Sequence, residues 1–292
     1  MIRLKDHLFP KTVEEAVQML GGVGGRGRIL AGGTDLVETL LEGNPGIDVF
    51  VDIRRIEQIK SIVVTGDSIV IGGGVTHAQV AASDPIKKHA TVLAEACLTV
   101  GGPQIRNLGT LAGNIASAQP AADGSLGLVA LGAVATVAGP GYERRVDITD
   151  AFADVGVSTI DPTKEIITEI TVPMGDKGSG SNYQRLAIRR SLALPIVAAA
   201  ALVGLVNGHF KSARLAIGPM ASVPLLVTSV DEFLRDKPAS RDNALKAAER
   251  VVDIADPRDS PLRGSREYRL AMVHLLTYKA LMTASMRARD NG

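Results

Sequence analysis

The chain has 292 residues, a length that favours two domains or subdomains over one core. A formal net charge of +1 and an aromatic content of 3%, with no tryptophan, argue against partners such as nucleic acid or an anionic membrane surface. One cysteine cannot form an internal disulfide or hold an iron–sulfur cluster alone, and no apolar run has the length of a membrane span. We therefore expect a soluble globular protein of a reducing compartment, the cytoplasm.

The first part of the chain predicts a small unit of alternating strands and helices. Thr12 and Glu15 form a capping-box pattern at the start of a helix. Residues 28–31 then predict a short strand, residues 32–35 (Gly-Gly-Thr-Asp) a turn, and residues 36–41 a helix. A strand, a Gly-Gly-hydroxyl turn and a helix direct free N–H groups at one point, where an anion can bind. A plain tight turn before a helix explains this motif equally well.

The middle of the chain predicts strands joined by tight turns, with short helices between them. The predicted elements are strands 49–53, 62–65, 68–71, 133–138, 143–148 and 165–172, and helices 91–100 and 126–131. Glycine-rich turns join the second strand to the third and the fourth to the fifth, so each of these pairs is predicted to be a hairpin.

The segment from Val100 to Asp123 is the most unusual stretch of the sequence. It contains four glycines and two prolines, and before Asp123 it has no acidic side chain and Arg106 is its single charge. Glycine lets a backbone approach a ligand closely, and clustered N–H groups form a concavity for an anion. The segment therefore predicts a long loop that wraps a phosphate-bearing ligand, although an ordinary surface connection remains the alternative.

The composition changes after Pro173. Residues 175–181 are predicted to be a linker or an exposed turn, and three strands are predicted over residues 183–188, 196–206 and 210–217. Asn207-Gly208 is a hairpin signal between the last two strands. Helical patterns over residues 230–234, 243–252 and 265–286 complete a separate α+β domain.

The residues that carry chemistry are few. The five histidines have no metal-ligand spacing, and Cys97 falls on the apolar face of a predicted helix, so all read as structural. Asp35 and Asp123 each end a glycine-rich element, where a carboxylate can accept hydrogen bonds from ribose or ribityl hydroxyls; Asp123 could equally be a helix N-cap. These features predict a dinucleotide-like redox cofactor between two glycine loops, with no catalytic side chain and no metal ligand.

Two motifs then resemble a known family. Residues 29–36 (ILAGGTDL) and, about 65 residues later, residues 102–115 (GPQIRNLGTLAGNI) resemble the FAD-binding medium subunit of molybdenum hydroxylases. This family includes the flavoprotein subunits of xanthine, carbon monoxide, nicotinate and quinoline dehydrogenases. The resemblance extends to Phe9-Pro10, Ala118-x-Pro120-x-x-Asp123 and Tyr183-x-Arg185, and so covers nearly the whole chain.

The resemblance implies an α+β fold of two domains. Residues 1–176 would form a two-part FAD-binding domain, with a small N-terminal βα subdomain (about 1–56) and a larger mixed-sheet subdomain (57–176). Residues 177–292 would form a C-terminal domain in which a three-stranded antiparallel sheet packs with helices.

The resemblance also implies which residues bind FAD. The first glycine motif and the second would contact the pyrophosphate, residues 100 and 101 would lie near the adenine, and residues 116, 117 and 123 would lie farther along the cofactor. Two further residues, on a strand of the first domain and in the C-terminal domain, would approach it. The expected cofactor-binding residues are Ile29, Leu30, Ala31, Gly32, Gly33, Thr34, Asp35, Leu36, Val100, Gly101, Thr110, Gly113, Asn114, Ala116, Ser117, Asp123, Ile167 and Arg185.

Two positions depart from the family pattern. Ala112 stands where a glycine is common, which adds a methyl group near the backbone of the second motif. Asn114 stands where either Asp or Asn occurs, and asparagine is more similar to the xanthine and heterocycle branch.

The function implied by the resemblance is electron transfer within a heterotrimer. A large subunit with a molybdopterin cofactor would oxidise the substrate, and a small subunit with two [2Fe–2S] clusters would pass electrons to FAD in this chain. FAD would then reduce an external acceptor such as NAD⁺, a quinone or oxygen, and the family expectation is a dimer of heterotrimers. The alternatives are a free-standing FAD-dependent reductase and a non-redox module that binds an adenine nucleotide.

Overall fold

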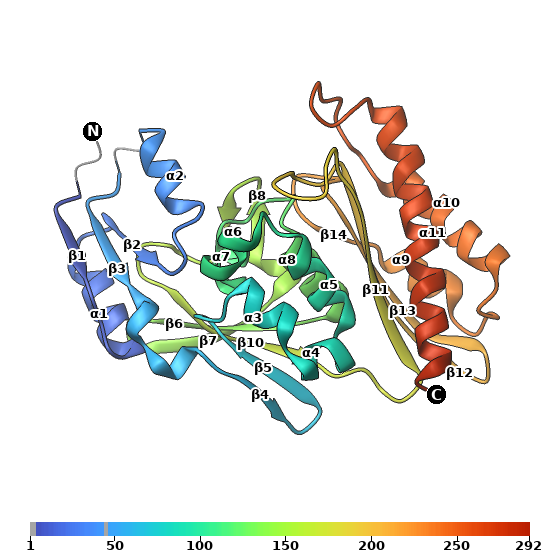
Figure 1. The fold of residues 1–292 in the computed structure, drawn as a ribbon, viewed down its shortest axis with the longest axis horizontal. Helices are drawn as coiled ribbons and strands as arrows, with labels where there is room; N and C mark the ends of the chain where they lie inside the picture. Colours follow the sequence, from blue (N-terminus) through green and yellow to red (C-terminus); the bar gives the residue numbers. More distant parts are fainter. Residues whose placement is uncertain (1–3, 44–45) are drawn as a thin grey trace.

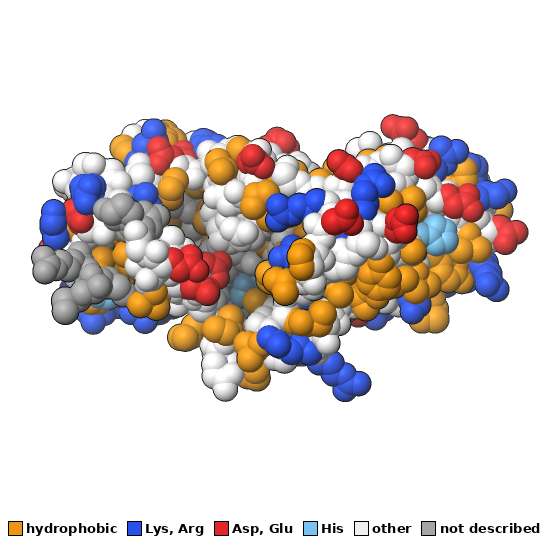
Figure 2. All heavy atoms as spheres, turned by 90° about the horizontal axis from the view of Figure 1, so that it is seen from above, with side chains coloured by type: hydrophobic (Ala, Val, Ile, Leu, Met, Phe, Trp, Pro, Cys, Tyr) orange, Lys and Arg blue, Asp and Glu red, His pale blue; other side chains and the backbone are white. Residues whose placement is uncertain are grey.

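The computed structural model describes residues 4–43 and 46–292 and places three sheets side by side along an elongated molecule. Figure 1 shows the N-terminal sheet at one end, a central sheet covered by helices, and the C-terminal sheet with its long helix at the other end. On the face shown in Figure 2, basic and acidic side chains are interspersed, and hydrophobic side chains gather along one edge. Within the described ranges, no helix is long and apolar enough to cross a membrane.

The N-terminal part is a three-stranded parallel sheet with the strand order β1-β3-β2. Its elements are β1 (Asp6–Leu8), α1 (Val13–Gly22), β2 (Gly27–Leu30), α2 (Leu36–Leu41) and β3 (Val49–Asp52). The Thr12 hydroxyl accepts a hydrogen bond from the Glu15 N–H at 3.1 Å, so the predicted N-cap is confirmed. Glu15 accepts from the Lys11 N–H and not from the Thr12 N–H, so the second bond of the predicted capping box is not formed. Strand β1 was not predicted, because three residues are too few to show a periodic pattern.

The central part is a five-stranded sheet with the order β4-β5-β10-β6-β7. Its strands are β4 (Ile62–Thr65), β5 (Ser68–Gly72), β6 (Val134–Gly139), β7 (Tyr142–Asp147) and β10 (Ile166–Pro173). Every pair in it is antiparallel, whereas a mixed sheet was expected. Both predicted hairpins are confirmed. A small hairpin of β8 (Phe152–Asp154) and β9 (Val157–Ser158) lies beyond the sheet.

Six helices of the central part follow between β5 and β6. They are α3 (His77–Ala82), α4 (Asp84–His89), α5 (Thr91–Thr99), α6 (Pro103–Leu108), α7 (Leu111–Ala116) and α8 (Asp123–Leu131). Short 3₁₀ turns occur at Ile53–Arg55, Glu57–Ile59 and Ile148–Ala151. Helix α8 is buried along its whole length, and its apolar residues join those of β5, β6 and β10 in the largest core of the protein.

The prediction of one long loop from Val100 to Asp123 is wrong. The segment folds as two short helices, α6 and α7, joined at Gly109. Pro103 occupies the first turn of α6, where its missing N–H costs nothing, and the Thr110 hydroxyl caps α7 by accepting from the Gly113 N–H at 3.0 Å. Gly102 and Gly109 cap α6 at its two ends and Gly113 lies within α7, which is why the sequence resembled an irregular loop.

The C-terminal part is an antiparallel sheet with the order β11-β12-β13-β14. Its strands are β11 (Ser179–Leu186), β12 (Val197–Val206), β13 (His209–Gly218) and β14 (Leu225–Leu226), and its helices are α9 (Thr228–Leu234), α10 (Arg241–Ile254) and α11 (Arg266–Asp290). The expected sheet of three strands thus gains a fourth, two-residue strand. Strand β11 also begins within the predicted linker, because Gly180 packs against the backbone of α11, where a β-carbon would lie 2.2 Å from the Ala284 oxygen.

Strand β12 joins two cores. Ala198 and Ala200 belong to the core shared with the central part, whereas Ala199 and Ala201 belong to the core under α10 and α11. Successive side chains of a strand point to opposite faces, so the four alanines alternate between these two cores. The C-terminal sheet is therefore packed on both faces, with α5 and α8 on one side and α11 on the other.

Candidate functional site

The two glycine motifs meet backbone against backbone. A β-carbon on Gly32 would lie 2.1 Å from the Leu108 carbonyl oxygen and 2.7 Å from the Gly109 α-carbon. One on Gly109 would lie 3.4 Å from the Thr34 hydroxyl oxygen. Segments about 75 residues apart in sequence therefore form one surface, as the prediction of a shared site required. A side chain at position 32 would force them apart.

The first loop presents a row of unused backbone donors. Gly33 has a φ of +72°, and a β-carbon there would lie 2.9 Å from Leu30 Cδ1. The first helical hydrogen bond of this turn runs from the Val37 N–H to the Gly33 oxygen at 3.0 Å. Among the described residues, the N–H groups of residues 32–36 donate no hydrogen bond. Five consecutive donors beside a positive-φ glycine suit an anion such as a pyrophosphate, so the loop fits the phosphate end of FAD.

The second loop is built differently from the first. The Gly113 N–H donates to the Thr110 hydroxyl, so the Gly113 N–H faces into the loop. The Asn114 side-chain oxygen accepts from the Ser125 N–H at 2.9 Å and thereby ties α7 to the first turn of α8. These contacts show that Thr110 and Asn114 shape the loop, and Ala112 is buried.

Asp35 directly precedes α2, and Ser117 directly follows α7. Burial raises the pKa of the Asp35 carboxyl, and the nearby Ser117 side chain opposes that shift. The Ser117 hydroxyl itself donates to the Asn114 oxygen at 3.1 Å. Asp35 is exposed at the edge of the first loop, and these two predicted site residues, far apart in sequence, lie near each other.

Asp123 is the centre of a buried polar cluster. It is 6% exposed, and its Oδ1 accepts from the Tyr183 hydroxyl at 2.5 Å and from Arg185 Nε at 3.0 Å. Burial raises the pKa of Asp123, while the positive charge of Arg185 and the hydrogen bonds oppose the shift. Burial and the Asp123 charge both raise the pKa of Tyr183. Asp123 makes no capping bond and is the first residue of α8, so the N-cap alternative is wrong.

A loop of the C-terminal part closes over the end of α5. The Leu192 N–H and the Ser191 hydroxyl both donate to the Gly101 oxygen at 3.0 Å. Arg185 Nη2 donates to the Ala193 oxygen in the same loop. Gly101, expected near the adenine, and Asp123, expected farther along the cofactor, are therefore joined through one loop and one arginine.

A neutral histidine lies beneath the second glycine loop. His77 is 2% exposed, and its Nδ1 is 3.4 Å from the Cys97 sulfur. Burial lowers the pKa of His77 to about 4, with a smaller contribution from Arg106. Burial also raises the pKa of the Cys97 thiol. The inference that Cys97 is a core residue is confirmed, and no group of three or more metal-ligating side chains forms within the described residues.

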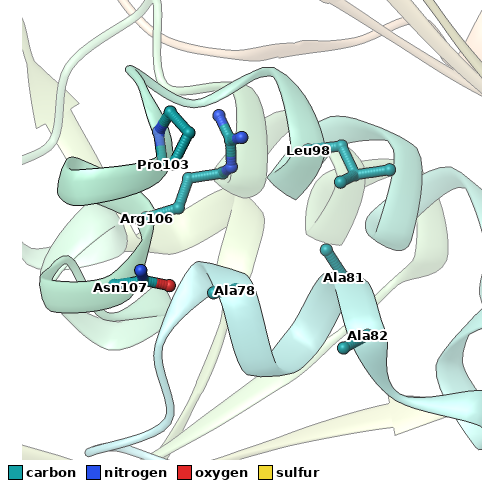
Figure 3. Close-up of a pocket in the computed structure, with 7 residues that line it drawn as sticks. All are labelled: Ala78, Ala81, Ala82, Leu98, Pro103, Arg106 and Asn107. Atoms are coloured by element: carbon teal, nitrogen blue, oxygen red, sulfur yellow. The ribbon is translucent and has the colours of Figure 1, made fainter.

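A shallow pocket of about 250 Å³ lies between α3 and α6, beside Leu98 of α5 (Figure 3). Alanines of α3 form one wall, and Arg106 and Asn107 of α6 stand opposite. Arg106 is held by its Nη1, which donates to the Val100 oxygen at 3.0 Å. None of the predicted cofactor-binding residues lines this pocket, although Pro103, Arg106 and Asn107 belong to the second glycine motif.

Not every predicted residue presents its side chain to this surface. Leu30 belongs to a small core with Leu40 and Phe50, and Ile29 packs toward the core under α1. Ile167 is buried in the central core. At these positions the side chains serve packing, so any contact with a cofactor falls to the backbone.

Tyr183 is the residue that the sequence reasoning left without a role. It was noted only as part of the pattern Tyr183-x-Arg185. The signal was nevertheless present, because residues two apart on a strand point to the same face and can hold one partner together.

Comparisons with known proteins agree with this architecture. Residues 4–175 match the family model described as the FAD binding domain in molybdopterin dehydrogenase. The chain belongs to the family of FAD-binding medium subunits of molybdenum hydroxylases. Residues 182–284 match the CO dehydrogenase flavoprotein C-terminal domain, which confirms the resemblance over both parts of this medium subunit.

Relatives cover almost all of the medium subunit. It is 30% identical over 285 residues to the alpha subunit of the 6-hydroxypseudooxynicotine dehydrogenase complex of Paenarthrobacter nicotinovorans, covering 97% of this chain and 95% of that one. It is 30% identical over 290 residues to the carbon monoxide dehydrogenase medium chain of Afipia carboxidovorans, covering 98% of each. A solved carbon monoxide dehydrogenase from Hydrogenophaga pseudoflava superposes with a TM-score of 0.92 at 27% identity, again covering 98% of each chain.

These relationships confirm the expected class of protein. The chain is the FAD-carrying subunit of a molybdenum-hydroxylase type of oxidoreductase, and it functions in electron transfer as part of a larger complex. The expected α+β fold is confirmed as well.

Proposed function

We propose that the backbone of the two glycine loops holds the pyrophosphate of FAD. The observation that carries the proposal is the contact of Gly32 with the backbone of Leu108 and Gly109, beside five unused N–H donors. The donors suit two phosphate charges, and no acidic side chain stands between Glu95 and Asp123. Gly32, Gly33 and Thr34 make the nearest approach, and residues 110–114 support it from the second loop.

The remaining residues form a band from the adenine end to the flavin end. Val100 and Gly101 lie at the adenine end, where residues 191–193 of the C-terminal part cover them. Ala116, Ser117 and Asp123 lie toward the flavin, with Arg185 behind Asp123. FAD supplies the redox chemistry when it is bound, and these residues of the chain bind and orient it and exclude water.

The electron donor in this proposal is a small partner subunit that carries two [2Fe–2S] clusters. A large partner subunit carries the molybdopterin cofactor and oxidises the substrate, and an external acceptor receives the electrons. The complex is a dimer of heterotrimers in the cytoplasm. Support comes from the matches to medium chains and complex subunits and from the one cysteine, which cannot hold a cluster alone.

The domain boundary in this proposal lies near residue 176. The FAD-binding domain spans residues 1–176, with subdomains of about 1–56 and 57–176, and the C-terminal domain spans residues 177–292. The two family matches leave residues 176–181 between them, and the central sheet ends at Pro173.

Mild native purification from the source organism tests the assembly. One absorbance spectrum and a metal analysis of the same sample are sufficient. The proposal predicts flavin bands together with iron and molybdenum in step with this chain. Flavin without either metal after the chain has been isolated under these conditions would favour a free-standing reductase, and a different nucleotide without flavin would favour a non-redox binding module.

A further inference from the structure

The chain contains the pattern Tyr-x-Arg twice, and in each copy the tyrosine and the arginine donate hydrogen bonds to one buried carboxylate. We call each such group a Tyr–Arg clamp. Tyr142 and Arg144 on β7 hold Glu165, and Tyr183 and Arg185 on β11 hold Asp123. In each case both donors come from one face of one strand. The two clamps therefore provide an internal comparison of the same chemical arrangement.

The first clamp satisfies its carboxylate completely. Glu165 Oε1 accepts from the Tyr142 hydroxyl and from Arg144 Nε, both at 2.8 Å. Glu165 Oε2 accepts from Arg144 Nη2 at 2.9 Å and from the Asp161 N–H at 2.7 Å. Because four donors fill the capacity of two carboxylate oxygens, this clamp is closed to any ligand. The Arg144 hydrogen bond is the largest cause that lowers the pKa of Glu165 to about 2.

The second clamp leaves one oxygen unused. Both of its donors meet Oδ1 of Asp123, and Arg185 Nη2 bonds to the Ala193 oxygen instead of to Oδ2. The hydroxyl of the neighbouring Thr99 donates to the Ala96 oxygen at 2.7 Å instead. A carboxylate that is 6% exposed normally has donors on both oxygens. Within the described residues, Oδ2 has none.

The open oxygen lies beside the proposed cofactor surface. Asp123 begins α8, and a β-carbon on the next residue, Gly124, would lie 2.9 Å from the Asn114 side-chain oxygen in the second glycine loop. A donor from the ligand can therefore complete the site where the protein does not. The flavin end of FAD offers ribityl hydroxyls and a ring N–H.

We propose that Tyr183 is a positioning residue, which with Arg185 fixes Asp123 so that Oδ2 accepts a hydrogen bond from the flavin end of FAD. This inference rests on the proposed function. Tyr183 does not touch the cofactor but acts through Asp123, and because it lies on β11 it also ties the C-terminal part to the cofactor site.

The test uses Tyr183→Phe in the whole complex after its FAD has been removed. Titration with FAD measures the dissociation constant, and the visible spectrum of the bound flavin is recorded. Tyr183→Phe is expected to raise the dissociation constant about tenfold, which corresponds to ~1.4 kcal/mol, and to shift the flavin band. Tyr142→Phe removes the matching bond to Glu165 and is expected to change neither quantity.

A double-mutant cycle separates positioning from a general structural effect. In the background of Asp123→Asn, Tyr183→Phe is expected to cause less than a twofold further change, because its effect passes through the carboxylate. Equal effects in both backgrounds, or wild-type affinity and spectrum in Tyr183→Phe, would overturn the inference. If Tyr183→Phe does not fold, Arg185→Lys against Arg144→Lys provides the same comparison. A wild-type complex that binds no FAD would instead refute the proposed function.

Discussion

Gly32 and Leu108 are in such close contact that the backbone of Leu108 fills the space of a side chain at position 32. The distance from a β-carbon on Gly32 to the Leu108 oxygen would be 2.1 Å, shorter than any real contact of this kind. The two glycine loops can therefore meet only because Gly32 has no β-carbon. Both the local packing and the proposed cofactor surface rely on this contact.

Gly32→Ala is expected to lower both stability and FAD content. The added methyl group must displace backbone atoms, and overpacking of this kind costs about 1–3 kcal/mol. Urea unfolding measures the loss of stability, and the ratio of flavin to protein measures the cofactor. The matched control is Gly21→Ala in α1, where the β-carbon would meet no atom within 4 Å. Equal stability and flavin content in the two variants would show that the loops do not pack as described.

His77 is expected to make the protein less stable in mild acid. Its pKa is about 4 in the folded protein and 6.5 in the unfolded chain, so the unfolded state binds more protons between these values. The free energy of unfolding should therefore fall as the pH is lowered from about 6.5 to about 4, on the order of 3 kcal/mol for a shift of this size.

His77→Gln removes the titrating group and should flatten this part of the stability curve. The free energy of unfolding of both proteins, measured by denaturant at several pH values, checks the expectation. His274→Gln is the control, since His274 lies partly exposed on α11. The same acid slope in wild type and His77→Gln would mean that His77 does not cause it.

The sequence predicted the order of elements well where local signals are strong. The hairpin between β12 and β13 followed from Asn207-Gly208, and the start of α1 followed from the Thr12 cap. Helices α6 and α7 were not predicted because helices of six residues show little periodicity, and because glycines lie at both ends of α6 and inside α7. The two-residue strand β14 exists only through pairing with β13, which no local pattern can reveal.

The candidate site was predictable as a set of loops but not as a set of contacts. Free N–H groups at residues 32–36 follow from the strand, turn and helix pattern, and the glycines of the sequence predicted them. The pairing of Asp123 with Tyr183 joins residues 60 positions apart. It depends on how the C-terminal sheet packs against α8, a tertiary relationship that the order of residues does not contain.

The central claim, that the first glycine loop holds the FAD pyrophosphate, is tested most directly at Gly33. The measurement is the flavin content of the purified complex carrying Gly33→Asp, with Gly33→Ala and Gly66→Asp as controls. Gly33→Ala introduces the β-carbon at the same positive φ without a charge, and Gly66 has a positive φ in an open hairpin turn. We predict that Gly33→Asp loses its flavin because a carboxylate faces the phosphates, whereas Gly33→Ala keeps part of it and Gly66→Asp keeps all of it. A Gly33→Asp complex with wild-type flavin content would contradict the claim.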